Sequence, residues 1–338
     1  MKGFVGNILT IVLVAVLPAC GGKGDSNRQI LRTALRQAQG SAQDNIRKMP
    51  EGPGVPTMIT DRTEAAEYLV AHFWNAFLEG DYLCDSTHVN GVSSGEVESA
   101  FVKYVTLLEN NCTREFALRK MTEFFGDVEK YSVEHKGSNV FGFFEKTVPK
   151  YLYDPNSPMR DEDLYHPYVS RLASSALVDK DMKPAYSHDA AMCALNQVGT
   201  QATDFSFTDL SGRRHTLHGI KADYILLMFT NPGCDACHEV IETIKSNAAV
   251  PKLVKAGKLA VVNVYIDLER EKWHALAKEY PAEWYNGYDQ DFAIRQDLTY
   301  SVRGIPSLYI LDRDKKVIMK DAPTDKAVLY LQNIQINP

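Results

Sequence analysis

Residues 223–246 read DYILLMFTNPGCDACHEVIETIKS, and this stretch decides how the rest of the chain is interpreted. Its segment 224–229 is apolar without alternation, which is typical of a strand buried on both faces. The letters NPG then break the run, as turn residues do, and apolar residues resume at helical spacing. We therefore predict a strand, a turn and a helix, with Cys234 and Cys237 at the start of the helix.

The position of these cysteines favours redox chemistry. Unpaired N–H groups and the positive end of the helix dipole stabilise a thiolate at a helix N-terminus. Cys234 is the predicted exposed nucleophile. Cys237, one turn into the helix, is the predicted resolving thiol that closes a disulfide and releases a mixed-disulfide partner.

A second stretch, VRGIPSLYILD at 302–312, places a proline where an apolar strand begins. Proline is tolerated there only as the first residue or at an edge. With the CxxC motif, this stretch resembles the thioredoxin superfamily. The resemblance implies a cis proline beside the cysteines, and a substrate strand that pairs with the backbone at Ile305 and Pro306. Residues 202–335 further resemble the TlpA/ResA-like envelope thioredoxins, through DF and DLSG in their entry hairpin.

Three positions depart from that family. Gly233 replaces a tryptophan, Met228 replaces a buried aspartate, and Val240 stands where ResA-like proteins place a glutamate. Glu239 and Glu242 flank that last position without occupying it, so neither is assigned as the proton acceptor. The residues leave the redox direction open, and the resemblance favours reduction.

Other interpretations of the two cysteines remain open. Cys234 to His238 form a CxxCH string, which is the attachment pattern of c-type haem. The only methionine downstream, Met319, falls in a predicted strand, and a haem protein gives no reason for the proline stretch. Zinc is disfavoured because no second CxxC and no His-x₃–₅-His pair is present. Two buried structural cysteines are the plainest alternative. We expect no metal and no cofactor.

Length and composition are those of an ordinary two-domain protein. The chain has 338 residues, of which 45% are hydrophobic and 24% charged, and a net charge of −6. A clustered basic surface is what nucleic-acid binding needs, so this charge balance gives no basis for it.

The N-terminus predicts export and a lipid anchor. Residues 1–19 form the predicted signal peptide, with Lys2 ahead of an apolar segment too short to span a membrane. The sequence LPAC ends that segment and resembles a bacterial lipobox, which implies lipidation of Cys20. Residues 20–26 are the predicted tether, and Gly21 implies outer-membrane sorting by analogy with Gram-negative lipoproteins. Ordinary secretion without a lipid anchor is the alternative. The sequence does not indicate whether the anchored protein would face the periplasm or the cell exterior.

The fold class that we predict is a two-domain α+β chain. Residues 27–195 form an all-helical domain of unknown role, and residues 196–338 form an α/β thioredoxin-like domain. Apolar spacing in the first domain predicts helices at 27–48, 63–79, 94–110, 113–131, 139–151 and 161–174. That domain shows no catalytic constellation, and its aromatic stripes are interpreted as core.

Three further cysteines, Cys84, Cys112 and Cys193, lie in the helical domain. An oxidising compartment permits disulfides, but an odd number leaves at least one thiol unpaired within the chain. A bridge between Cys84 and Cys112 is one possibility, and free buried thiols are the other.

These observations predict a lipid-anchored thiol–disulfide oxidoreductase of the bacterial cell envelope. Its expected partners are substrate proteins with disulfides or thiols, and an electron donor or acceptor that the sequence does not identify. The alternative is a lipoprotein whose helical domain binds a partner or ligand while the thioredoxin fold serves as a platform.

Overall fold

The computed structural model describes residues 45–336. Lys48–Pro338 form one compact unit, which holds both regions described below. The predicted signal peptide, the tether and Cys20 lie outside the described residues. Most of the predicted helix at 27–48 lies outside them too, and its last residues, 45–48, are not helical.

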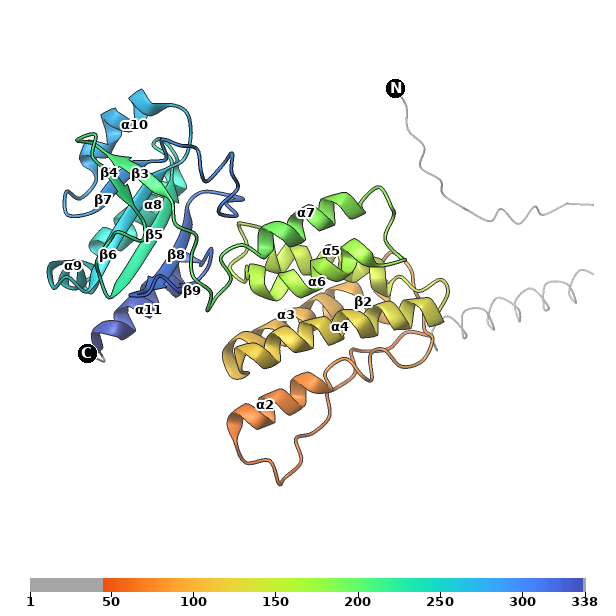
Figure 1. The fold of residues 1–338 in the computed structure, drawn as a ribbon. Helices are drawn as coiled ribbons and strands as arrows, with labels where there is room; N and C mark the ends of the chain where they lie inside the picture. Colours follow the sequence, from red (N-terminus) through yellow and green to blue (C-terminus); the bar gives the residue numbers. More distant parts are fainter. Residues whose placement is uncertain (1–44, 337–338) are drawn as a thin grey trace, which may run out of the picture. The chain divides into compact units, whose positions relative to one another are not determined.

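Six helices make up most of the first region, which we call the helical region (Figure 1). They are α2 (Arg62–Ala71), α3 (Ser94–Asn111), α4 (Arg114–Glu134), α5 (Val140–Leu152), α6 (Glu162–Ser174) and α7 (Lys183–Cys193). Hydroxyl and carboxylate side chains cap four of them: Asp61, Ser93, Thr113 and Asp161 each accept a hydrogen bond from a backbone N–H of the first turn. The apolar stripes of α3 to α6 form one core, so the interpretation of the aromatics as core is confirmed.

The helical region differs from the prediction in three places. Helix α2 ends at Ala71, and residues 72–78 form turns in which Trp74 and Phe77 are buried against α4 and α5. Helix α7 was not predicted because Cys193 is its only buried residue, so it has no apolar periodicity. A short hairpin, β1 (His88–Val89) and β2 (Val92–Ser93), was also missed, although its Asn-Gly turn is a hairpin signal.

The second region, which we call the sheet domain, contains a mixed seven-stranded sheet in the order β4-β3-β7-β6-β5-β8-β9. The strands are β3 (Ser206–Asp209), β4 (Arg214–Thr216), β5 (Tyr224–Thr230), β6 (Leu259–Tyr265), β7 (Tyr285–Tyr288), β8 (Ser307–Asp312) and β9 (Val317–Met319). The helices are α8 (Asp235–Ser246), α9 (Val250–Lys255), α10 (Arg270–Leu276), the 3₁₀ helix η1 (Ala277–Glu279) and α11 (Thr324–Ile336). The predicted order, helical region first and α/β region second, is confirmed.

Both faces of the central strand β5 are covered, as its unbroken apolar run predicts. Leu226 and Met228 pack in a cluster with residues of α8, α9 and α11. Ile225, Leu227 and Phe229 point to the opposite face and pack in the cluster that holds Tyr300 and Tyr309 among others. The strand pairs in parallel with β6 and antiparallel with β8, so it lies inside the sheet.

Strand β7 has no apolar run in the sequence. Tyr285–Tyr288 nevertheless form a strand that is parallel to β6 and antiparallel to β3. Gly287 permits this close pairing, since a Cβ added there would lie 2.4 Å from the ring of Phe207. The segment after β7, residues 291–296, consists mostly of turns.

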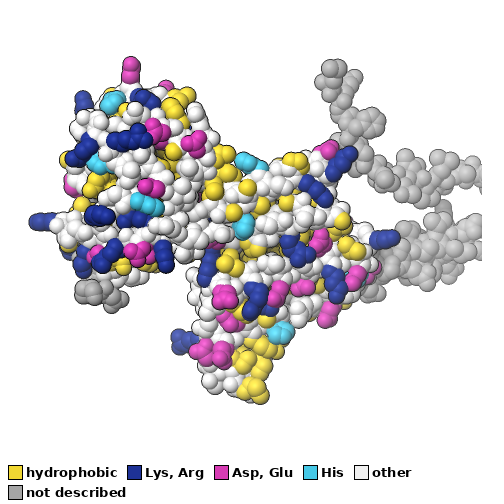
Figure 2. All heavy atoms as spheres, in the orientation of Figure 1, with side chains coloured by type: hydrophobic (Ala, Val, Ile, Leu, Met, Phe, Trp, Pro, Cys, Tyr) yellow, Lys and Arg dark blue, Asp and Glu magenta, His cyan; other side chains and the backbone are white. Residues whose placement is uncertain are grey.

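The surface carries both signs of charge. On the face in view in Figure 2, basic and acidic side chains are interspersed over the described residues. Within residues 45–336, none of the helices has the length and apolar character needed to cross a membrane.

Candidate functional site

The pairing of β5 with β8 brings the CxxC segment and the cis-proline segment to the same end of the sheet. Phe229, near the end of β5, pairs with Ser307 at the start of β8. Because β5 and β8 are antiparallel, the turn that follows β5 and the loop that precedes β8 meet at the same end of the sheet. Cys234 lies just beyond that turn and Pro306 closes that loop, so strand pairing alone places them close together.

Cys234 is the N-cap residue of α8, as predicted from the strand–turn–helix pattern. Its sulfur accepts a hydrogen bond from the N–H of Cys237 at 3.2 Å. It also lies 4.0 Å from the carbonyl oxygen of Ile305, to which the thiol donates. The Ile305–Pro306 peptide bond is cis, as the resemblance implied. The four residues singled out from sequence therefore form one constellation.

The two thiols differ in their exposure to solvent. Cys234 is partly exposed, whereas the side chain of Cys237 is buried and its residue only 1% exposed. Burial, together with hydrogen bonding to Cys234, raises the pKa of the Cys237 thiol. An accessible sulfur beside a buried one suits an attacking thiol followed by a resolving thiol.

Among the described residues, neither Glu239 nor Glu242 supplies a buried carboxylate at the site. Both are exposed on α8, and Glu242 pairs with Lys245 at 2.6 Å. Tyr280, which the sequence did not single out, interacts electrostatically with both thiols. Burial raises the pKa of Tyr280 to about 12, and charge on Cys237 and Cys234 adds to that shift.

Because burial keeps Cys237 in its thiol form, we expect the resolving step to accelerate as the pH rises. The rate should increase roughly tenfold per pH unit between about pH 6 and about pH 9, in step with the thiolate fraction. The test is stopped-flow release of a chromophoric thiol from a mixed disulfide preformed on Cys234. A resolving rate that does not change with pH would contradict this prediction.

The raised pKa of Cys237 also links folding stability to pH. The folded state holds the thiol proton of Cys237 more tightly than the unfolded chain does, so the stability that this group contributes is fully present below the ordinary thiol pKa. It is lost as the pH rises from that value through the raised pKa of the folded state.

The turn before Cys234 requires glycine. Gly233 has φ +80°, a left-handed conformation, and a Cβ there would lie 3.2 Å from Cε and 3.3 Å from Nζ of Lys272. A side chain at 233 would therefore be strained by the backbone conformation and would also meet the end of the Lys272 side chain of α10. Lys272 was not identified from the sequence and places a cation beside the active-site turn.

We expect Gly233→Ala to lower the free energy of unfolding by about 1–2 kcal/mol and to slow disulfide exchange as well. Gly212→Ala is the matched control, because Gly212 has φ +82° but open space around the added Cβ. It should lower the melting temperature similarly and leave exchange unchanged. Thermal unfolding and turnover of both variants provide the check, and equal turnover would show that the Lys272 contact is unimportant.

The other cysteines of the described chain form no bridge. Cys84, Cys112 and Cys193 are free thiols, so the possible Cys84–Cys112 disulfide is absent from the structure. Burial raises the pKa of Cys112 to about 11, which disfavours a reactive role. Within the part of the chain that is described, no three His, Cys, Asp or Glu side chains gather as metal ligands.

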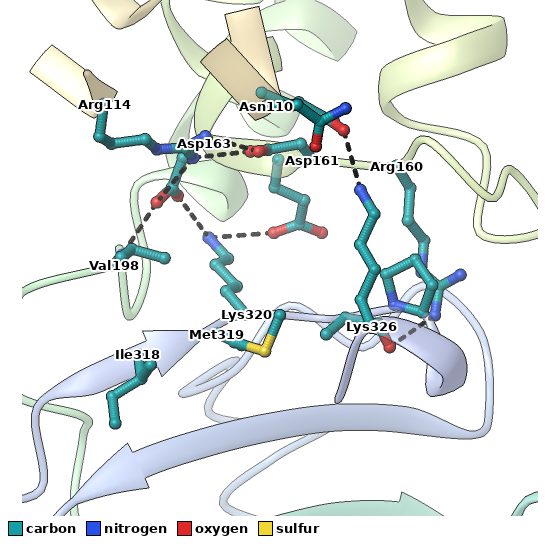
Figure 3. A pocket seen from close by; sticks show the side chains of 14 residues that line it. Asn110, Arg114, Arg160, Asp161, Asp163, Val198, Ile318, Met319, Lys320 and Lys326 are labelled. Carbon is teal, nitrogen blue, oxygen red and sulfur yellow. Dashed lines mark hydrogen bonds and ion pairs between the residues drawn. The ribbon is translucent and has the colours of Figure 1, made fainter. Parts of the chain in front are cut away.

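A charged cavity of about 390 Å³ lies between the helical region and the sheet domain, away from the thiols. Figure 3 shows Lys320 directed toward Asp163, beside the ion pair of Arg114 with Asp161. The Lys320 ammonium also lies 3.0 Å from Glu162 and donates to the carbonyl oxygens of Cys193 and Leu195 at 2.7 and 2.6 Å. These charges pair with one another, so we interpret the cluster around the cavity as a contact that joins the two regions and not as a ligand site.

Comparison with known proteins gives two kinds of match. A family model described as a domain of unknown function (DUF5106) matches residues 20–196. The thiol–disulfide oxidoreductase ResA of a Bacillus cereus strain is 28% identical over 147 residues, which cover 41% of this chain and 79% of that protein. The thioredoxin-like protein YneN of Bacillus subtilis (strain 168) is 35% identical over 130 residues, covering 36% of this chain and 69% of that protein.

One solved structure matches across both regions. The crystal structure of a thioredoxin-like protein from Bacteroides caccae ATCC 43185 is 33% identical, with a TM-score of 0.72. The match covers 84% of this chain and 98% of that one. The combination of helical region and sheet domain is therefore shared with a second protein, beyond the likeness of the sheet domain to other thioredoxin-like proteins.

Proposed function

Because this chain belongs to the thioredoxin-like family and carries the DUF5106 domain ahead of its thioredoxin-like domain, we propose that it is a thiol–disulfide oxidoreductase working through Cys234 and Cys237. The observation that carries the proposal is the constellation of an accessible thiol, a buried thiol and the backbone of a cis proline. Cys234 accepts a hydrogen bond from the N–H of Cys237 and faces the carbonyl of Ile305.

In the proposed reaction, the Cys234 thiolate attacks one sulfur of a substrate disulfide. A mixed disulfide forms and the first substrate thiolate leaves. The Cys237 thiolate then attacks the sulfur of Cys234, the second substrate thiolate leaves, and the enzyme becomes a Cys234–Cys237 disulfide. The substrate gains two electrons and the dithiol loses two, so a dithiol donor must restore the enzyme.

The cis-proline loop is the proposed binding site for the substrate. Ile305 is the residue before Pro306, and its carbonyl oxygen lies 4.0 Å from the sulfur of Cys234. We propose that the backbone there pairs with an extended segment of the substrate protein, so that the substrate sulfur comes to Cys234. Backbone pairing recognises protein disulfides of many sequences, since every residue supplies the same groups.

Two measurements test the proposal. Reduction of insulin disulfides by the full chain, with a small dithiol as donor, should depend on the enzyme concentration. The reduction potential of the Cys234–Cys237 couple decides direction: about −270 mV indicates a reductant and about −120 mV an oxidant. Absence of any reaction between the dithiol and a protein disulfide would sink the proposal. We propose reduction as the direction.

We further propose that the chain acts in the cell envelope, anchored to the outer membrane by lipid on Cys20. The apolar segment ending in LPAC supports this. Several acyl chains on one residue give stable anchoring. Radiolabelled fatty acid should be incorporated into the chain in cells and lost in Cys20→Ala, and membrane fractionation should follow the label. Label retained in that variant would refute the anchor.

A further inference from the structure

The loop that leads into the cis proline contacts the helical region at three of its residues. The Ser301 hydroxyl donates to Oε1 of Glu162 at 3.0 Å, and Nε of Arg303 donates to the same oxygen at 2.6 Å. A Cβ added to Gly304 would lie 3.0 Å from Cβ of Pro155. Residues 301–304 of the sheet domain therefore lie directly on α6 and on the loop after α5.

Arg303 is held from three sides. Its guanidinium pairs with Glu162, lies 4.1 Å from the ring centroid of Tyr153, and pairs with Asp321 at 3.0 Å. The exposed fractions of the paired side chains are 13% for Arg303, 1% for Glu162 and 8% for Asp321. Buried pairs of this kind hold a fixed geometry because breaking one leaves a charge without compensation.

Asp321 also holds the residue that follows the proline. One carboxylate oxygen accepts from Nη2 of Arg303, and the other accepts from the hydroxyl of Ser307 at 2.7 Å. Arg303 precedes Ile305 by two residues and Ser307 follows Pro306 directly. The two loop residues proposed to contact substrate are thus flanked on both sides by hydrogen bonds to one buried carboxylate.

Close packing does not fix Arg303 by itself. Cavities of about 290 Å³ and about 750 Å³ lie next to it, and Tyr153 and Arg303 line both. With these cavities beside it, the Arg303 side chain depends on the ion pairs and the aromatic ring of Tyr153 for its position. Most of those contacts come from the helical region.

We propose that the helical region positions the substrate-contact loop, with Glu162 and Tyr153 acting through Arg303 to hold Ile305 and Pro306 over Cys234. Glu162, Tyr153 and Arg303 are positioning residues that touch neither sulfur. The inference rests on the proposed function, and it assigns a role to a domain for which the matching family model gives none.

The test compares two substrates of the full chain. One is a peptide with an internal disulfide, and the other is 2-hydroxyethyl disulfide, which has no peptide backbone to pair with the loop. In Arg303→Met we expect kcat/KM for the peptide to fall roughly 10–100-fold, because small displacements of a positioned group carry losses of that size. The rate with 2-hydroxyethyl disulfide and the reduction potential should stay within about twofold of the parent protein.

A milder pair of variants guards against misfolding. Gly304→Ala places a Cβ against Pro155 and should displace the loop by a few tenths of an ångström, raising KM for the peptide alone. Adding Pro155→Gly removes the opposing atoms and should restore KM. Pro155 is exposed, so the rescue tests the contact between the regions with little risk to the fold.

The outcomes separate cleanly. Loss with the peptide alone, with rescue in the double variant, supports positioning. Equal losses with both substrates, or no loss with either, overturn it. If the parent protein turns over neither substrate, the proposed function fails, and hydrogen exchange still decides the inference. The amides of Gly304, Ile305 and Ser307, the residues around the proline, should exchange faster in Arg303→Met than in the parent, and unchanged exchange would overturn positioning.

Discussion

Cys234→Ser should abolish turnover of protein disulfides and leave only the uncatalysed exchange between donor and substrate. A serine hydroxyl forms no disulfide, so the first covalent step is lost. Cys237→Ser should instead accept the substrate and fail to release it, because the buried resolving thiol is missing. Mass spectrometry of that variant after mixing with a substrate disulfide should find a stoichiometric mixed disulfide on Cys234.

Cys84→Ser is the matched control for both variants, since Cys84 is another partly exposed thiol of the same chain. Its turnover should equal that of the parent. Full turnover by Cys234→Ser, or an adduct located on Cys84, Cys112 or Cys193, would remove the central dithiol from the mechanism.

Lys320→Met is expected to lower the free energy of unfolding by about 3–5 kcal/mol, the largest stability effect that we foresee for a single side chain. The side chain is 2% exposed and pairs with Glu162. Its ammonium also donates to the carbonyl oxygen of Cys193, the last residue of α7, and to that of Leu195 just beyond the helix. Methionine keeps the length and removes the charge, so Oε2 of Glu162 loses its ion pair and two carbonyl oxygens lose a donor. Urea unfolding followed by circular dichroism measures the loss.

An exposed lysine shows what the same substitution does without burial. Lys245 pairs with Glu242 on the surface of α8, and Lys245→Met should leave the unfolding midpoint unchanged. If the Lys320 and Lys245 variants unfolded at the same urea concentration, the junction between the two regions would have no special energetic weight.

The centre of the site was predictable because its signals are local. An unbroken apolar run, a turn and a CxxC place Cys234 at the start of α8, and antiparallel pairing of β5 with β8 does the rest. The cis proline came from resemblance, since residue spacing has no bearing on peptide-bond isomers. The helices α3 to α6 were predictable for the same local reason: one face of each is buried.

What the sequence could not show depends on distant partners. Arg303 and Glu162 are 141 residues apart, and a charged residue in either place suggests a solvated surface until the fold brings the two together. Strand β7 was missed because its residues Tyr285–Tyr288 have no apolar run, and their pairing with β6 and β3 supplies the order. The position of Lys272 beside the turn at Gly233 could not be predicted either, because only the folded structure brings the two residues together.

The pairing of Glu162 in the helical region with Arg303 and Lys320 in the sheet domain has a consequence for protein engineering. A chimaera that joins this sheet domain to a different partner would leave Arg303 and Lys320 facing whatever surface replaces Glu162. Such an exchange needs compensating substitutions at these positions, made in the same step. The two regions are therefore interchangeable with those of other proteins only as a matched set, even though each has its own apolar core.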